Sequence, residues 1–255
     1  MKFETYIPCT LLAFYIKAFI IQETDNEQAY KVLPGTGLVI GFQYKGKLSL
    51  AGEGKDTALS NSGITGLQNS YQIFTNSQNI GTVLVLFKEA GAAPFFRQPL
   101  HELFGESLSL DNFILQSELL VFEEQLCEAK TDRGKIDAVE NFLLARLNTA
   151  PPDKLVTAAL SLTHAAKGNI KIAALCKQLY TSQSPLEKRF RQAVGASPKK
   201  YAAIVRFKHL LQQHPSAQSL TQLGYEAGFY DQAHFIKEFK TFTGLTPENY
   251  FAGGG

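Results

Sequence analysis

The chain has 255 residues, of which 45% are hydrophobic and 19% charged, and its formal net charge at pH 7 is +2. This composition is typical of a folded protein, and the length suits one large domain or two modest ones. No apolar run reaches the roughly 18 residues of a membrane-spanning helix, and the first residues lack the pattern of a signal peptide. We therefore expect a cytoplasmic protein without a membrane contact.

The charge is distributed unevenly along the sequence. Residues 168–255 contain 11 Lys and Arg against 5 Asp and Glu, a net charge of +6, whereas residues 1–167 contain 14 against 18, a net charge of −4. A basic C-terminal third on an acidic remainder is typical of a nucleic-acid-binding module joined to another domain.

The three cysteines, Cys9, Cys127 and Cys176, are far apart, and no Cys or His cluster has the spacing of a zinc site. We expect three reduced and mostly buried thiols. The sequence predicts no metal site, no cofactor and no catalytic residues.

The first hundred residues are predicted to form β structure. The apolar runs at 37–42 and 82–87 are typical of strands, and Gly- and Asn-rich turns separate them. From about residue 110, apolar residues recur at helical spacing, and we expect Ser109 or Asp111 to cap the first helix. The fold class is therefore predicted to be α+β. Its N-terminal domain, residues 1–148, is a small β-barrel or sandwich with appended helices over about 110–148.

Two consecutive prolines, Pro151 and Pro152, interrupt the helical pattern. Because proline cannot continue a helix, residues 149–152 are predicted to be a linker. Everything that follows is predicted to be helical, so we expect an all-α domain over residues 153–251.

An internal repeat with an offset of 49 residues dominates this second half. The pattern Phe-x4-Gly-x-[Ser/Thr]-Pro-x-x-Tyr begins at Phe190 and again at Phe239. So many matches at one offset indicate that one supersecondary unit is used twice.

Each repeat unit is predicted to be a helix-turn-helix. Ser182 and Asp231 are suitable helix N-caps, and a shorter helix precedes each of them by a turn of three or four residues. Gly228 supplies a positive φ in the second turn, where the first unit has Tyr180. The units are predicted at about 170–194 and 219–243, joined by a helix over about 198–213.

These residues resemble the DNA-binding domain of the AraC/XylS family of transcriptional regulators. The resemblance covers about residues 153–251 and is carried by the segments 228–240 (GFYDQAHFIKEFK) and 244–250 (GLTPENY), and by 182–201 in the first unit. The chain departs from the family pattern at Tyr180, Cys176 and Phe251. The resemblance implies a regulator of transcription, expected to be an activator. Its expected partners are double-stranded DNA, RNA polymerase and a small-molecule effector bound by the N-terminal domain.

The candidate DNA contacts lie on the second helix of each unit. Gln pairs with adenine, and Arg or Lys with guanine, in the major groove. Residues early in each helix are expected to read bases, namely Gln183, Ser184, Glu187, Gln232, Ala233 and His234. Later basic residues could equally hold phosphates, namely Lys188, Arg191, Lys237 and Lys240. A rigid joining helix would place the two sets about one DNA turn, roughly 34 Å, apart.

The sequence also leaves two other functions to consider. In an enzyme-linked DNA-repair regulator the N-terminal domain would carry a zinc site, for which Cys9 and Cys127 are too few ligands. In a ligand-independent regulator that domain would only form a homodimer or contact partners, although the apolar stripes of residues 111–147 more commonly pack on their own domain. Ligand-binding residues cannot be assigned from the sequence. Phe42, Tyr44 and Tyr71 are aromatic candidates that ordinary strand packing also explains.

Overall fold

The computed structural model describes residues 1–52, 56–212, 224, 228 and 231–254. Its N-terminal part consists of two antiparallel sheets that face each other. The larger has the strand order β1-β2-β9-β4-β7-β10 and the smaller the order β3-β8-β5-β6. Among the described strands neither sheet closes into a barrel, so the sandwich alternative is the correct one. The strands are β1 (Lys2–Tyr6), β2 (Ile16–Thr24), β3 (Gln28–Val32), β4 (Val39–Lys45), β5 (Leu48–Leu50), β6 (Thr57–Ala58), β7 (Ser62–Thr65), β8 (Gln72–Asn76), β9 (Ile80–Phe87) and β10 (Ser107–Ser109).

The strand β9 is central to the larger sheet because it pairs with both β2 and β4. Its side chains alternate between the two faces. Val83, Val85 and Phe87 belong to the main hydrophobic core, whereas Leu84 and Leu86 face the smaller sheet across a cavity. The apolar runs predicted at 37–42 and 82–87 thus correspond to β4 and β9.

Two helices, α1 (Gln116–Glu128) and α2 (Asp132–Leu144), cover the outer face of the larger sheet. The ring of Phe122 lies 4.8 Å from that of Phe42 on β4 and 4.0 Å from that of Phe142 on α2. The expected helix start near residue 110 was wrong. A short 3-10 turn, η4 (Leu110–Asn112), precedes α1, and Ser109 makes no side-chain capping bond.

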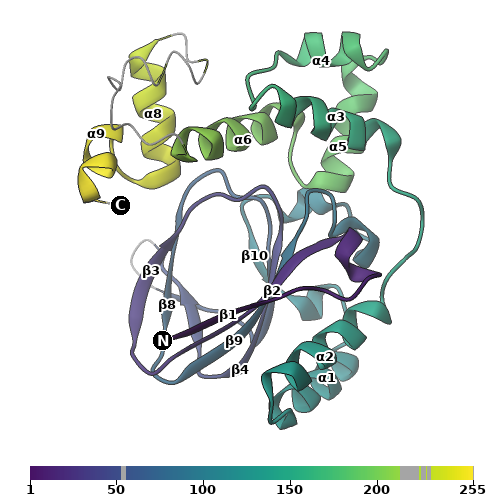
Figure 1. Ribbon diagram of the computed structural model, residues 1–255, viewed down its shortest axis with the longest axis vertical. Helices are drawn as coiled ribbons and strands as arrows, with labels where there is room; N and C mark the ends of the chain where they lie inside the picture. Colours follow the sequence, from purple (N-terminus) through teal and green to yellow (C-terminus); the bar gives the residue numbers. More distant parts are fainter. Residues whose placement is uncertain (53–55, 213–223, 225–227, 229–230, 255) are drawn as a thin grey trace.

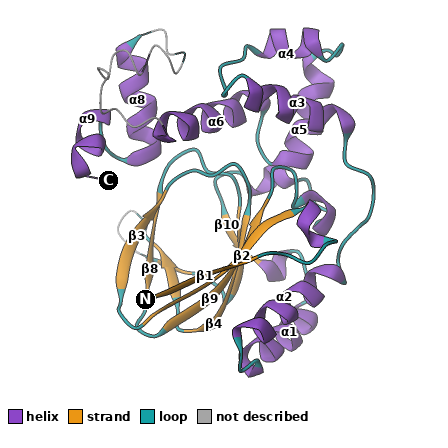
Figure 2. Ribbon diagram, in the orientation of Figure 1, coloured by secondary structure: helices purple, strands orange, loops and turns teal. Residues whose placement is uncertain are grey.

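The described residues of the C-terminal part form helices and connecting loops (Figure 2). Residues 147–153 form neither helix nor strand, and after them the chain enters the helical region. In Figure 1, α6 runs from the group α3–α5 to α8 and α9. The helices are α3 (Lys154–Ala165), α4 (Ile172–Gln178), α5 (Gln183–Val194), α6 (Pro198–Gln212), α8 (Gln232–Thr243) and α9 (Pro247–Asn249), with a final turn η5 (Tyr250–Gly254). The combination of two sheets with these helices confirms the α+β class.

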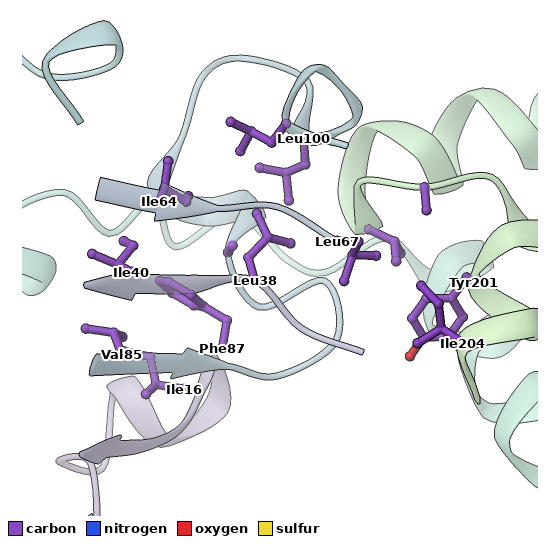
Figure 3. Packing of buried hydrophobic residues seen from close by; sticks show 14 of the residues in the cluster. Ile16, Leu38, Ile40, Ile64, Leu67, Val85, Phe87, Leu100, Tyr201 and Ile204 are labelled. Atoms are coloured by element: carbon purple, nitrogen blue, oxygen red, sulfur yellow. The ribbon is translucent and has the colours of Figure 1, made fainter. Parts of the chain in front are cut away.

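One hydrophobic cluster connects the sheets with the helical region. Figure 3 shows Ile40, Val85 and Phe87 of the larger sheet, and beyond Leu67 the side chains of Tyr201 and Ile204 on α6. Tyr201 is fully buried, and its hydroxyl lies 3.0 Å from Nε2 of His164 on α3. The two parts of the chain therefore share packing at their boundary.

The turns of the two repeat units differ by one residue. Tyr180 has φ +51° and Gly228 has φ +79°, so both adopt the left-handed conformation. Ser182 follows Tyr180 by two residues, however, whereas Asp231 follows Gly228 by three. Tyr180 therefore adopts the conformation of Gly228 one residue closer to the N-cap, at a steric cost that glycine does not have.

The caps of the second helices also differ. Asp231 accepts a hydrogen bond from the main-chain N–H of His234 at 2.7 Å. Ser182 occupies the predicted N-cap position of α5, but its side chain does not accept the capping bond that was expected of it. Both helices end on the expected left-handed glycines, Gly195 (φ +93°) and Gly244 (φ +79°).

The first helix of the second unit, expected over 220–227, lies outside the described residues except for Gly224, which is helical. A Cβ atom at Gly224 would lie 3.1 Å from the Phe235 ring. This close approach explains why the residue that lies against the Phe235 ring has no side chain.

The cysteines are all free thiols, but only Cys176 is buried, so the expectation of mostly buried thiols was wrong. Cys127 lies near the C-terminal end of α1 and is exposed, with its Sγ 3.7 Å from the main-chain oxygen of Tyr44. Within the described residues, no helix is long and apolar enough to span a membrane.

Candidate nucleic-acid interface

The helix α5 has one buried face and one exposed face. Leu186, Phe190 and Val194 are buried, and the Phe190 ring packs edge-on against Tyr201 of α6 with centroids 5.5 Å apart. This spacing of four residues places apolar side chains on one side of the helix. The opposite side is therefore free to contact a partner.

The five predicted contact residues of α5 line one shallow groove, together with Gln192 and with His101 of the N-terminal domain. Four of the five are exposed, and Glu187 is half-buried. Gln183 Nε2 donates to Glu187 Oε1 at 2.8 Å, which orders the two side chains relative to each other. The five residues are Gln183, Ser184, Glu187, Lys188 and Arg191.

The helix α8 repeats this arrangement. Phe235 and Phe239 are buried with Phe242, and Phe242 and Phe239 pack against Phe207 of α6 with centroids 4.7 and 5.8 Å apart. The predicted contact residues on its other side are all exposed, namely Gln232, Ala233, His234, Lys237 and Lys240.

An ion pair connects α8 to the joining helix. Arg206 Nη2 of α6 lies 2.7 Å from Glu238 Oε1, and both side chains are about four-fifths buried. Glu238 Oε2 also lies 3.8 Å from His234 Nε2. The position of α8 relative to α6 is therefore held by charged contacts as well as by aromatic packing.

The structure thus brings the ten predicted residues together as two groups of five, one on α5 and one on α8, on either side of α6. Sequence reasoning did not include Gln192 or His101 among the contacts. Gln192 follows Arg191 on the same helix and could have been found from helical spacing. His101 could not, because it approaches α5 from a 3-10 turn, η3 (Leu100–Leu103), that is distant in the chain.

The N-terminal domain contacts both units at equivalent positions. A Cβ atom at Gly195, which ends α5, would lie 3.2 Å from the main-chain oxygen of Leu100. A Cβ atom at Gly244, which ends α8, would lie 2.8 Å from the ring of Tyr71. Next to it, Lys31 Nζ donates to the main-chain oxygen of Thr243 at 2.9 Å.

A cavity of about 430 Å³ lies between the two sheets of the N-terminal domain. It is of a size that small-molecule sites commonly have. None of the aromatic candidates Phe42, Tyr44 and Tyr71 lines it. Phe42 packs on Phe122 instead, and the Tyr44 hydroxyl donates to Glu23 Oε1 at 2.8 Å.

Comparison with known proteins matches two segments of the chain. Residues 4–109 match a domain of unknown function, DUF6597, and residues 175–253 match a helix-turn-helix domain. The arabinose operon regulatory protein of Escherichia coli is 29% identical over 127 residues, which cover 46% of this chain and 44% of that protein. The chain is therefore similar to transcriptional regulators of the AraC/XylS family. The helix-turn-helix match spans α5, α6 and α8 and so covers the second helix of both repeat units.

One further relative and one solved structure complete the comparison. An uncharacterised helix-turn-helix transcriptional regulator of Haemophilus influenzae is 30% identical over 151 residues, covering 52% of this chain and 50% of that protein. The solved structure of ToxT from Vibrio cholerae is 12% identical, with a TM-score of 0.47, and covers 99% of this chain and 98% of that one. The chain spans about half the length of the curated relatives it matches.

Proposed function

We propose that this protein is a sequence-specific regulator of transcription that binds duplex DNA through α5 and α8. The observation that carries the proposal is the pair of exposed, polar and basic helix faces held on either side of α6. Each helix would enter one segment of the major groove, with early residues reading bases and later Lys and Arg holding phosphates. From the family, we expect activation together with RNA polymerase, in the cytoplasm.

The test measures binding to duplexes selected from a random-sequence pool, at several salt concentrations. The quadruple change Lys188→Ala, Arg191→Ala, Lys237→Ala and Lys240→Ala should weaken binding strongly. If all four hold phosphates, the slope of log affinity against log salt should fall by about 4. Unchanged binding would contradict the docking of α5 and α8.

The matched control removes the same number of charges elsewhere. Lys45, Lys47, Arg97 and Lys130 are exposed on the N-terminal domain and also comprise three Lys and one Arg. Changing these four to Ala lowers the net charge equally, so it should leave the salt slope close to that of the wild type. A similar loss in both variants would show that net charge, and not the faces of α5 and α8, drives binding.

We further propose that an effector bound by the N-terminal domain controls this activity, because the cavity between its sheets has the size of a ligand site. A saturable rise in the melting temperature of the full chain with a small molecule would support this.

The alternative is an N-terminal domain that only forms a homodimer. It is motivated by α1, where Leu120 and Val121 are 57% and 55% exposed although Leu119, Phe122 and Leu126 pack on the sheet. Changing Leu120 and Val121 to Glu should leave a monomer unaffected and should dissociate a dimer built on this face. Sedimentation of both forms distinguishes the two cases.

A further inference from the structure

The cavity between the sheets exists because two glycines face each other on its floor. Gly41 of β4 and Gly63 of β7 are direct partners in the strand register. A Cβ atom at Gly41 would make only ordinary contacts, the nearest at 3.6 Å to Leu84 Cδ2. Neither glycine has a positive φ. The backbone therefore does not require glycine here, and what the two glycines provide is space.

The cavity wall is mainly apolar, with some neutral polar side chains and with the N-terminal residue Met1 among its lining residues. Val39, Leu84 and Leu86 line it from the larger sheet, and Tyr30, Leu48 and Phe74 line it from the smaller one. No described residue of its lining carries a charged side chain. An ionised ligand would lose its hydration without gaining a charged side chain of the described lining as its partner, so this wall favours a neutral, mainly apolar molecule.

One polar group in the cavity lacks a partner. Gln43 lines the cavity and is only 8% exposed. Its Oε1 atom is buried and accepts no hydrogen bond from any described residue. Buried acceptors are nearly always paired, because leaving one unpaired costs its full desolvation. A ligand with an O–H or N–H group would supply the missing donor once the Gln43 amide turns this buried oxygen toward the cavity.

The strand β3 separates this cavity from the second DNA-binding unit. Gln28, Tyr30 and Val32 line the cavity, and the alternation of side chains along the strand sends Lys31 to the opposite side. There Lys31 Nζ donates to the main-chain oxygen of Thr243, the last residue of α8. It also lies 5.1 Å from the centre of the Tyr71 ring, which packs against Gly244.

The smaller sheet packs into the N-terminal domain more weakly than the larger sheet does. β3 is its edge strand and pairs only with β8 among the described strands. Its buried side chains Leu48 and Phe74 form a small cluster with Ile80 of β9, apart from the main core. A molecule that enters between the sheets would therefore displace β3 and β8 more easily than β4 and β9.

From these contacts we infer that the N-terminal domain binds a neutral, mainly apolar molecule with an O–H or N–H donor to Gln43. We further infer that β3 transmits its presence to α8 through Lys31. The inference about transmission rests on the proposed function, since it concerns DNA binding. The inference about the ligand does not depend on it.

The ligand is tested on the full chain with three matched probes: 4-butylphenol, its methyl ether 4-butylanisole, and the anion 4-butylbenzoate. The phenol should raise the melting temperature saturably and bind about fivefold more tightly than the ether, because only the phenol donates to Gln43. The benzoate should cause no shift. Absence of a saturable shift with the phenol, or equal binding of the benzoate, would overturn the ligand assignment.

Three cavity variants make this test specific. Gln43→Leu keeps the side chain's size, so the preference for the phenol over the ether should fall to about one. Gly41→Val fills the floor of the cavity and should abolish binding of both neutral probes. Gly41→Ala, a smaller change for the case that Val disturbs the sheet, should weaken binding of both. Retained phenol preference in the Leu variant, or full binding in the Ala variant, would contradict the site.

The transmission is tested by DNA binding with and without 4-butylphenol. Lys31→Met should retain the thermal shift but lose the probe's effect on DNA affinity, whereas the control Lys130→Met should retain both. If Lys31→Met retains the full effect on DNA, the link through β3 is wrong. If the wild type binds the probe but no DNA, the proposed function fails while the ligand site stands.

Discussion

The guanidinium of Arg189 donates two hydrogen bonds to the carboxylate of Asp153, with both N–O distances at 2.6 Å. The same carboxylate caps α3, accepting from the main-chain N–H of Leu155 at 2.9 Å and of Val156 at 3.1 Å. One side chain at the end of the linker therefore starts α3 and also holds α5.

Asp153→Ala is expected to lower the free energy of unfolding by about 1 kcal/mol from the lost cap alone. Burial acts to raise the pKa of Asp153, but the bonds from Arg189, Val156 and Leu155 outweigh it and hold that pKa below its ordinary value. This stabilisation is present above the pKa of the unfolded carboxyl, near 3.8, and is lost as the pH falls through the lowered pKa. Urea unfolding from pH 7 to pH 3 should show the wild type and the variant converging. Asp153→Asn, which can still cap, should lose less.

Tyr180→Gly is expected to stabilise the protein by about 0.5–1 kcal/mol. Tyr180 has φ +51° and is 97% exposed, so the change relieves backbone strain and removes almost no contact. Tyr180→Ala, which keeps a Cβ atom, should bring no such gain. Thermal unfolding of the three proteins makes the comparison, and a loss of stability in the Gly variant would contradict it.

Asp231→Ala and Ser182→Ala should differ although both residues hold the N-cap position. Asp231 accepts from the N–H of His234, so its loss should cost about 1 kcal/mol. Ser182 makes no capping bond, so its loss should cost close to nothing. Equal effects in denaturant unfolding would show that the caps are alike after all.

Lys208→Met is expected to raise the melting temperature at neutral pH. Lys208 lies in a pocket of about 350 Å³ between α6 and the larger sheet, and burial lowers its pKa, as does the nearby charge of Lys17. The charged form therefore destabilises the folded state. This penalty should diminish as the pH rises from the lowered pKa toward 10.5, the ordinary value for lysine. Lys199→Met, at the exposed start of α6, serves as the control.

Gln183→Ala and Gln232→Ala should relax sequence preference in different parts of the bound site. Each lies at the first position of its helix and is exposed. If each pairs with an adenine, its loss should cost about 1–3 kcal/mol of discrimination at one base pair. Selection from a random pool should place the two relaxed positions about 10 base pairs apart. Relaxation at the same position would contradict the two-segment arrangement.

The sequence by itself determined the helical half of this protein. The repeat that begins at Phe190 and Phe239 identified the buried faces of α5 and α8. Gly195 and Gly244 end these helices as expected. Such features depend on residues within one or two helical turns of each other, so they can be predicted from the spacing of residues in the sequence. Ser182 shows the limit, because a suitable cap residue is used only where the local turn brings it to the N–H groups.

Only the tertiary structure decided how the two halves meet. The contact of Lys31 with Thr243, the approach of Leu100 to Gly195, and the unpaired Gln43 between two sheets join residues that are distant in the chain or depend on the pairing of strands. Strand register and sheet-to-sheet packing depend on long-range contacts. No local pattern in the sequence indicates which strand lies at the edge of a sheet or which glycines face each other on neighbouring strands.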